Sequence, residues 1–181
     1  MPHTLLPFVS AAPALVARLA QLAEPWKTRY ADSTALATAV MSVHLGAMLV
    51  AGGLAIAADR GTLRAVRARP GGRRRQLVEI AGTHRPVTIA LALVMLSGAL
   101  LFLSDVETYA TSIAFWVKMG LVALLLANGL VMMRAEDGLR SGSLGDAAGV
   151  DRRWGVLRGA AVASAVLWVA TVLAGTVLGN I

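Results

Sequence analysis

Few side chains of this sequence could carry chemistry, and most of them lie in long apolar stretches. His44, Lys118 and Asn128 fall inside such stretches, and His84 comes just before one. Ionisable and strongly polar side chains are costly inside a membrane, where they usually face a protein interior or a ligand pathway. These four residues are therefore the first candidates for a functional site.

The histidine at position 44 has methionines on the same side of its predicted helix. Met41 lies three residues before His44 and Met48 four residues after it, and residues at these spacings share one helix face. Two thioethers beside an imidazole suit Cu(I), whereas one His with one Met suits haem iron. The sequence has no cysteine, which excludes thiolate metal sites, iron-sulfur clusters and c-type haem. Packing of the methionines beside a hydrogen-bonded His44 is the alternative.

Depth estimates bring residues of other helices level with His44. A helix rises ~1.5 Å per residue, and on this scale the level of His44 includes Met95, Lys118, Met119, Trp168 and Thr171. We predict that Met95, Lys118 and Trp168 help to bind a cofactor held by His44, although Lys118 is also long enough to reach the headgroups. His84 falls about 15–20 Å lower. This difference in height argues against one haem shared with His44, and we expect His84 to be interfacial and solvated.

The elements that must position these residues are transmembrane helices. The chain has 181 residues, of which 57% are hydrophobic and 15% are charged, a composition typical of a bilayer-embedded protein. Four apolar segments are long enough to cross a hydrocarbon core of ~30 Å, namely 34–58, 86–104, 112–133 and 154–178. Before them, residues 13–24 have the pattern of an amphipathic helix in the membrane interface. We predict an all-α fold, an integral membrane four-helix bundle with an N-terminal interfacial helix, in one domain of residues 1–181.

The basic residues indicate the orientation of the bundle. Segments 60–85 and 134–158 hold thirteen Lys or Arg, whereas the opposite side has three, Arg18, Lys27 and Arg29. Loops rich in Lys and Arg stay in the cytoplasm. We predict a bacterial inner-membrane protein with both termini on the periplasmic or outer side. The same clustering between apolar segments explains the net charge of +7 without a nucleic-acid partner.

Short motifs spread over most of the chain carry a resemblance. They are His-Leu-Gly at 44–46, Ala-Asp-Arg at 58–60, Ser-Gly-Ala-Leu-Leu-Phe at 97–102, Phe-Trp-Val-Lys-Met at 115–119 and Ser-Ala-Val-Leu-Trp at 164–168. With these motifs the chain resembles a family of small bacterial four-helix membrane proteins catalogued as a domain of unknown function, which is distantly similar to copper-resistance D and cytochrome b type membrane proteins. The resemblance implies that His44, Asp59, Arg60, Lys118, Asn128 and Trp168 are positions to test. Met41 and Thr176 stand where the family pattern has an acid and a base, so no charged site carries over to them.

Three functions from different classes fit these observations. The first is a membrane redox component that binds b-type haem through His44, with Met95 or a neighbouring Met as second ligand, and exchanges electrons with a quinone or a partner subunit. The second is a Cu(I)-binding or transport protein that uses the face of Met41, His44 and Met48. The third is a cofactor-free structural or accessory subunit, or a homo-oligomer, packed through small residues. No nucleophile with an adjacent base occurs in the apolar segments, which favours an electron-transfer or accessory role over a stand-alone enzyme.

Overall fold

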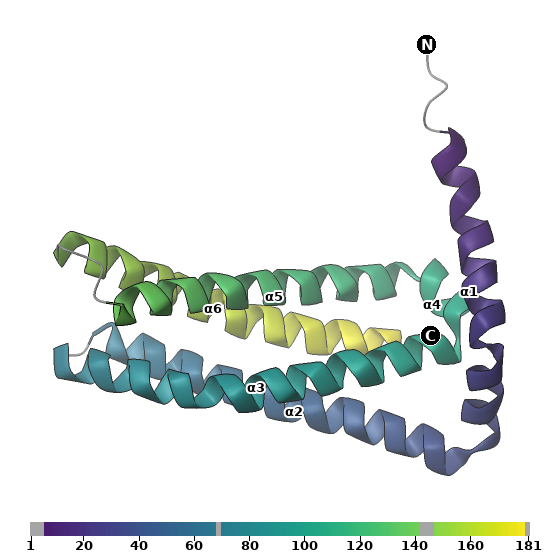
Figure 1. Ribbon diagram of the computed structural model, residues 1–181, viewed down its shortest axis with the longest axis horizontal. Helices are drawn as coiled ribbons and strands as arrows, with labels where there is room; N and C mark the ends of the chain where they lie inside the picture. The colour runs from purple at the N-terminus through teal and green to yellow at the C-terminus, as the bar shows by residue number, and fades with distance from the viewer. Residues whose placement is uncertain (1–5, 68–69, 142–146, 180–181) are drawn as a thin grey trace.

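The protein is a bundle of long helices. The computed structural model describes residues 6–67, 70–141 and 147–179, and in this part of the chain it contains helices and short connections without strands. The helices are α1 (Leu6–Asp32), α2 (Thr34–Ala65), α3 (Pro70–Ser104), α4 (Val106–Thr111), α5 (Ile113–Arg140) and α6 (Ala147–Leu178) (Figure 1). Among these residues, α2, α3, α5 and α6 are long and apolar enough to cross a membrane. The predicted all-α membrane bundle is confirmed.

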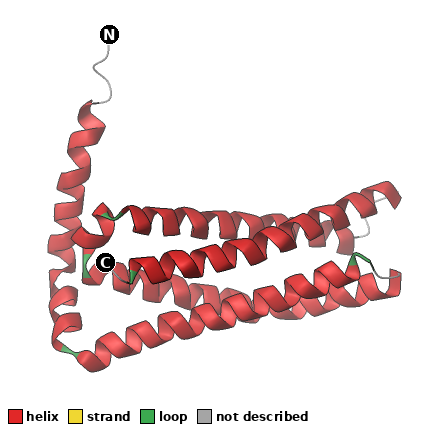
Figure 2. Cartoon of the chain, turned by 180° about the vertical axis from the view of Figure 1, so that it is seen from behind, coloured by secondary structure: helices red, strands yellow, loops and turns green. Residues whose placement is uncertain are grey.

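The four long helices form two antiparallel pairs. Helix α2 packs along α3, α5 packs along α6, and α2 also contacts α6 (Figure 1). The backbones of α3 and α5 stay apart along most of their length, and α6 is visible between them in Figure 1. We call the end of the bundle where α2 and α5 finish the basic end, and the opposite end, crossed by α1, the α1 end. The reverse view in Figure 2 shows the same two ends.

Serine side chains begin two of the spanning helices. Ser33 accepts a hydrogen bond from the backbone N–H of Leu36 at 3.2 Å and caps α2. Ser112 accepts one from the N–H of Phe115 at 3.4 Å and caps α5. Each cap satisfies a backbone donor that has no partner within its own helix.

The helices are longer at the basic end than their apolar segments. Helix α3 begins at Pro70 rather than at Pro86, α2 runs on to Ala65, α5 runs on to Arg140 and α6 begins at Ala147. The reason is a small core at this end, built from Ala65, Ala135, Trp154 and Leu157. These residues give the polar ends of the helices an inward apolar stripe. Pro86 lies inside α3 on its exposed side, so the predicted start of a helix at this proline was wrong.

Helix α1 lies across the end of the bundle, as an interfacial helix would. It is nearly perpendicular to the spanning helices (Figures 1 and 2), and its range of Leu6–Asp32 is longer than the predicted 13–24. The indole Nε1 of Trp26 donates to the backbone oxygen of Leu100 at 2.8 Å, which ties α1 to α3. Leu22, one turn before Trp26, is exposed and can enter the headgroup region.

Small residues allow α2 and α6 to approach closely. Ala51 is fully buried and forms a core with Ala90 and Trp168. A Cβ atom placed on Gly52 would lie 3.2 Å from Cε3 of Trp168, so the indole fits only because Gly52 has no side chain. This is the packing by small residues on which membrane helices rely.

We therefore expect Gly52→Leu to destabilise the protein. Its side chain would overlap the buried indole of Trp168, and overpacking of this kind costs about 1–3 kcal/mol. Gly53→Leu is the matched control, because a Cβ there meets no atom within 4 Å. Thermal unfolding in detergent should show a lower Tm for Gly52→Leu only. Equal Tm values for the two variants would contradict this packing.

Candidate functional site

The imidazole of His44 is buried between α2 and α3. Val40, His44, Ala47 and Ala51 are buried in turn along one face of α2, and His44 is only 7% exposed. Its Nδ1 lies 3.0 Å from the hydroxyl oxygen of Ser97 on α3. A histidine inside an apolar bundle thus has a specific polar partner.

The hydrogen bonds of Ser97 determine which ring nitrogen of His44 carries the proton. The Ser97 hydroxyl donates its single proton to the backbone oxygen of Leu93, at 2.6 Å. With the hydroxyl proton donated to Leu93, its oxygen accepts from the imidazole and Nδ1 of His44 is the donor, which is the tautomer that this geometry favours. In the neutral ring this tautomer leaves Nε2 with a lone pair. The imidazole also has a hydrogen bond to the backbone of Val94. A histidine in this tautomer is prepared to bind a metal or accept a proton through Nε2.

Two glycines give the polar side chains room. A Cβ on Gly98 would lie 3.2 Å from Cε1 of His44, and a Cβ on Gly175 of α6 would lie 3.5 Å from Nζ of Lys118. The charge of Lys118 is close enough to act on the imidazole of His44. The ammonium therefore lies against α6 near the α1 end of the bundle. Residues of α2, α3, α5 and α6 meet here, and we call His44, Ser97 and Lys118 the histidine site.

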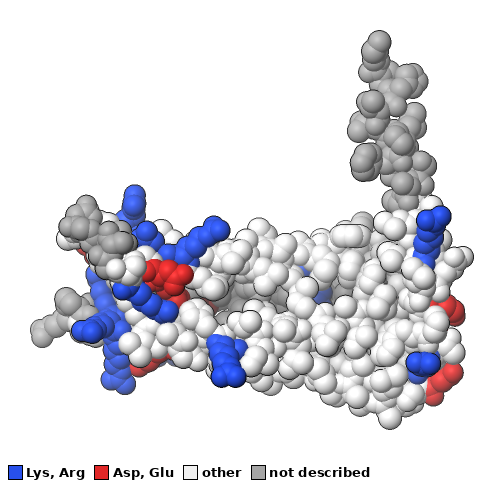
Figure 3. Space-filling view, in the orientation of Figure 1, with Lys and Arg blue, Asp and Glu red and all other residues white. Residues whose placement is uncertain are grey.

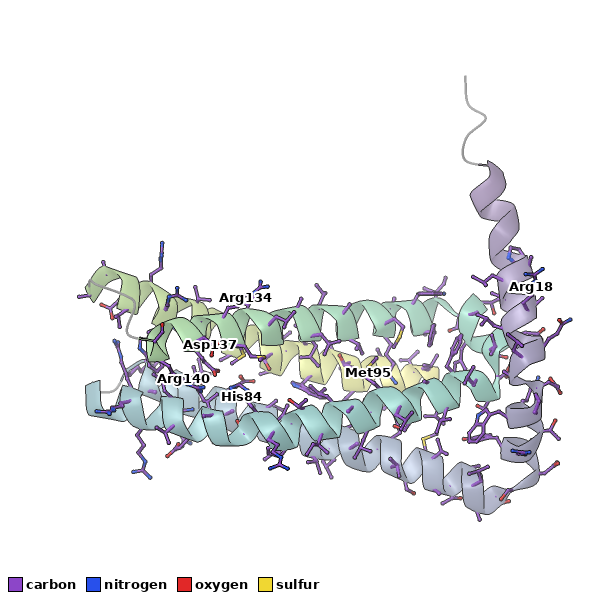
Figure 4. The ribbon with its side chains drawn as sticks, viewed as in Figure 1. Arg18, His84, Met95, Arg134, Asp137 and Arg140 are labelled. Atoms are coloured by element: carbon purple, nitrogen blue, oxygen red, sulfur yellow. The ribbon has the colours of Figure 1, made fainter. Side chains whose placement is uncertain are left out.

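The other predicted site residues lie in different surroundings. Trp168 is buried against Gly52, in the apolar core beside the histidine site. Met41 is 42% exposed on the outside of α2 and Met48 is half-buried, so the predicted Met-His-Met face is divided between interior and surface. Met95 is 50% exposed on α3 (Figure 4). The structure places Lys118 against Gly175 of α6, buries His44 and leaves Met41 outside.

A second polar cluster at the basic end was not predicted. Glu136 of α5 is only 1% exposed, and its Oε2 lies 2.8 Å from Nε2 of His84 on α3. Arg140 donates to the same oxygen at 3.3 Å and to the backbone oxygen of Leu77 at 3.0 Å. Figure 4 labels His84 and Arg140 of this cluster at the basic end of the bundle. His84, 38% exposed, is therefore tied to a buried carboxylate rather than freely solvated as expected.

The spacing of residues around Glu136 could have revealed this cluster. Met132, Ala135 and Leu139 contribute to the apolar core at the basic end, and Glu136 lies within the same helical repeat. A helix extended beyond the apolar segment would have placed Glu136 on the inner side of α5. The helix was predicted to end at residue 133, which hid this relation.

The positions implied by the resemblance differ in burial and in their hydrogen-bond partners. Asn128 donates from Nδ2 to the backbone oxygen of Ala160 at 3.0 Å and so joins α5 to α6. Asp59 is buried and accepts a hydrogen bond from Ser164. Arg60 is exposed and belongs to the basic surface. Asn128 and Asp59 thus have interior roles, whereas Arg60 does not.

Lys and Arg side chains gather at the basic end of the bundle (Figure 3). Arg73 of α3 pairs with Asp151 of α6 at 2.9 Å and lies 5.5 Å from the ring centre of Trp154. It also donates to the backbone oxygen of Val66, at 3.1 Å. Arg73 therefore holds the two helical hairpins together, while most other arginines here point into solvent.

The buried carboxylate of Glu136 should be essential for stability. We expect Glu136→Ala to lower the free energy of unfolding by roughly 2–3 kcal/mol, because His84 and Arg140 lose their shared anion while remaining partly exposed to water. Asp137→Ala, at the exposed neighbouring position, is the control and should change little. Denaturant titration in detergent measures both. A loss below about 0.5 kcal/mol for Glu136→Ala would show that the cluster is not a stabilising contact.

A role for the protein is inferred from these contacts, because the comparisons with known proteins give none. The resemblance to a family of four-helix membrane proteins stays a prediction. The chain matches no protein-family model, no curated protein and no solved structure.

Proposed function

We propose that the protein is a membrane redox component that binds b-type haem through Nε2 of His44. The observation that supports the proposal is the hydrogen bond between Nδ1 of His44 and Ser97, because a donor Nδ1 would leave Nε2 as the nitrogen that ligates iron. Haem proteins use a histidine with its second ring nitrogen hydrogen-bonded in this way. When bound, the haem supplies one-electron transfer, and the protein supplies its position and surroundings.

The residues of the histidine site fit such a cofactor. The imidazole of His44 is a suitable axial ligand, and the ammonium of Lys118 is a suitable partner for a propionate carboxylate. Gly98 and Gly175 leave space beside both groups. An apolar cavity of about 170 Å³ lies between α2 and α3 and includes Ser97 in its lining, but it is smaller than usual ligand pockets. Binding of a haem macrocycle here would therefore require the surrounding helices to separate.

Met95 is the candidate for a second ligand. It lies seven residues before Phe102, so the two residues share a face of α3. The ring of Phe102 stacks on Phe115 of α5 with a centroid distance of 5.2 Å, which shows that this face is directed toward α5. Met95 therefore lies on the side of α3 that is directed toward α5. A thioether at this place would raise the reduction potential of the haem.

The surroundings of the site favour exchange of electrons within the membrane. The apolar surfaces of the spanning helices suit a lipid-soluble quinone or a membrane-embedded partner subunit as the redox partner. We infer that the basic end faces the cytoplasm of a bacterial cell, because Lys and Arg gather there. The terminal residues 1–5 and 180–181 lie outside the described residues. The helices next to them, α1 and the last turns of α6, lie at the α1 end.

The absorption spectrum of the protein tests the proposal. After expression with sufficient haem and purification in detergent, we expect a Soret band and sharper visible bands on reduction. His44→Ala should abolish these bands because it removes the axial ligand. His84→Ala is the control, since His84 is bound to Glu136 at the basic end, and it should keep them.

Further variants and metal analysis separate this proposal from its alternatives. Lys118→Met should weaken haem retention without removing the Soret band, because it removes only the propionate partner. Copper bound without haem, and lost in a Met41/Met48 double alanine variant, would support the Cu(I) function instead. A haem spectrum that His44→Ala leaves unchanged would overturn the ligand assignment. Folded protein with neither haem nor copper would favour a cofactor-free accessory subunit.

A further inference from the structure

A second buried acid, Asp59, has much poorer partners than Glu136. Asp59 lies where α2 packs against α6, is 3% exposed and accepts a hydrogen bond from the hydroxyl of Ser164. Its other oxygen, Oδ2, is buried and has no hydrogen-bond partner among the described residues. A carboxylate normally accepts several hydrogen bonds. One oxygen of Asp59 is therefore available to another species.

The charged and polar groups around Asp59 are engaged elsewhere. On α2 and α3, Thr62 and Gln76 both donate to the backbone oxygen of Ala58, at 3.1 and 3.3 Å. Farther along the bundle, His84 of α3 is bound to Glu136, and Asn128 of α5 is bound to the backbone of Ala160. The nearest arginines along α2 and α6, Arg60 and Arg158, are exposed. Within the described residues, no Lys, Arg or His forms an ion pair with Asp59.

The two buried acids therefore face different physical situations. Glu136 is compensated by His84 and Arg140, so its negative charge is stabilised in the interior. Asp59 has a single neutral donor, and an uncompensated buried charge is costly. Such a carboxylate lowers its free energy by taking up a proton, which turns the free oxygen into a hydroxyl. Pairs of acids in contrasting environments commonly divide structural and proton-exchange roles.

We propose that Asp59 is a reversible proton-binding site in the basic half of the bundle. Hydronium or a buffer acid at the basic end gives up a proton, an O–H bond forms at Oδ2, and Ser164 keeps its hydrogen bond to the other oxygen. Release reverses the step and restores the carboxylate without any change in oxidation state. Thr62 and Gln76 lie between Asp59 and the basic end, and they provide the polar side of the route. This inference does not depend on haem.

Infrared difference spectroscopy of the detergent-purified protein, titrated with acid, tests the proposal. A buried carboxylic acid gives a carbonyl band separate from those of solvated acids, and the band shifts in D₂O. We expect this band to appear on acidification in the wild type and to be lost in Asp59→Asn. Asp137→Asn is the control, because that side chain is exposed, and it should keep the band.

A second variant keeps the test decisive if Asp59→Asn does not fold. Ser164→Ala retains the carboxyl group and removes its hydrogen bond, so the carbonyl band should move to higher wavenumber. Acid-difference spectra that are identical in the wild type, Asp59→Asn and Ser164→Ala would overturn the proposal. A band lost in Glu136→Gln and kept in Asp59→Asn would assign the proton to Glu136 and would also overturn it.

Discussion

The lipid interior offers no water to polar groups, and this constraint shapes the whole bundle. Every polar side chain within a spanning helix must find a protein partner or remain at high free energy. His44 meets Ser97, and Asn128 meets the backbone oxygen of Ala160. Each contact also joins two helices, so the polar groups help to fix the register of an otherwise apolar structure.

The polar groups are concentrated at two levels of the bundle. An apolar core of Ala51, Ala90 and Trp168 lies between the histidine site and the cluster around Glu136. The cluster at the basic end connects α3 to α5 through charged hydrogen bonds, where water and arginines are near. Near the α1 end, stacking of Phe102 on Phe115 connects the same two helices. Between these contacts their backbones stay apart, beside the histidine site.

The fold could be predicted from the sequence because segment length and hydropathy respond directly to the thickness of the bilayer. The burial of His44 and the presence of Lys118 beside it followed from helix rise and the position of each span. The pairing of His84 with Glu136 did not, because Glu136 lies beyond the apolar segment and a hydropathy pattern loses its signal there. The outward position of Met41 was also hidden, since residues on one broad helix face can be divided between neighbouring surfaces. Only the rotation of α2 against α3 determines which of them is buried.

Haem binding through His44 depends on Ser97, which would hold the imidazole with Nε2 free to act as a ligand. Nitrogen NMR of protein labelled at its histidine side chains, prepared without cofactor, measures the protonation of each ring nitrogen directly, and His44→Ala assigns the signals. We expect a neutral His44 with its proton on Nδ1 and none on Nε2. A proton on Nε2, alone or together with one on Nδ1, would contradict it.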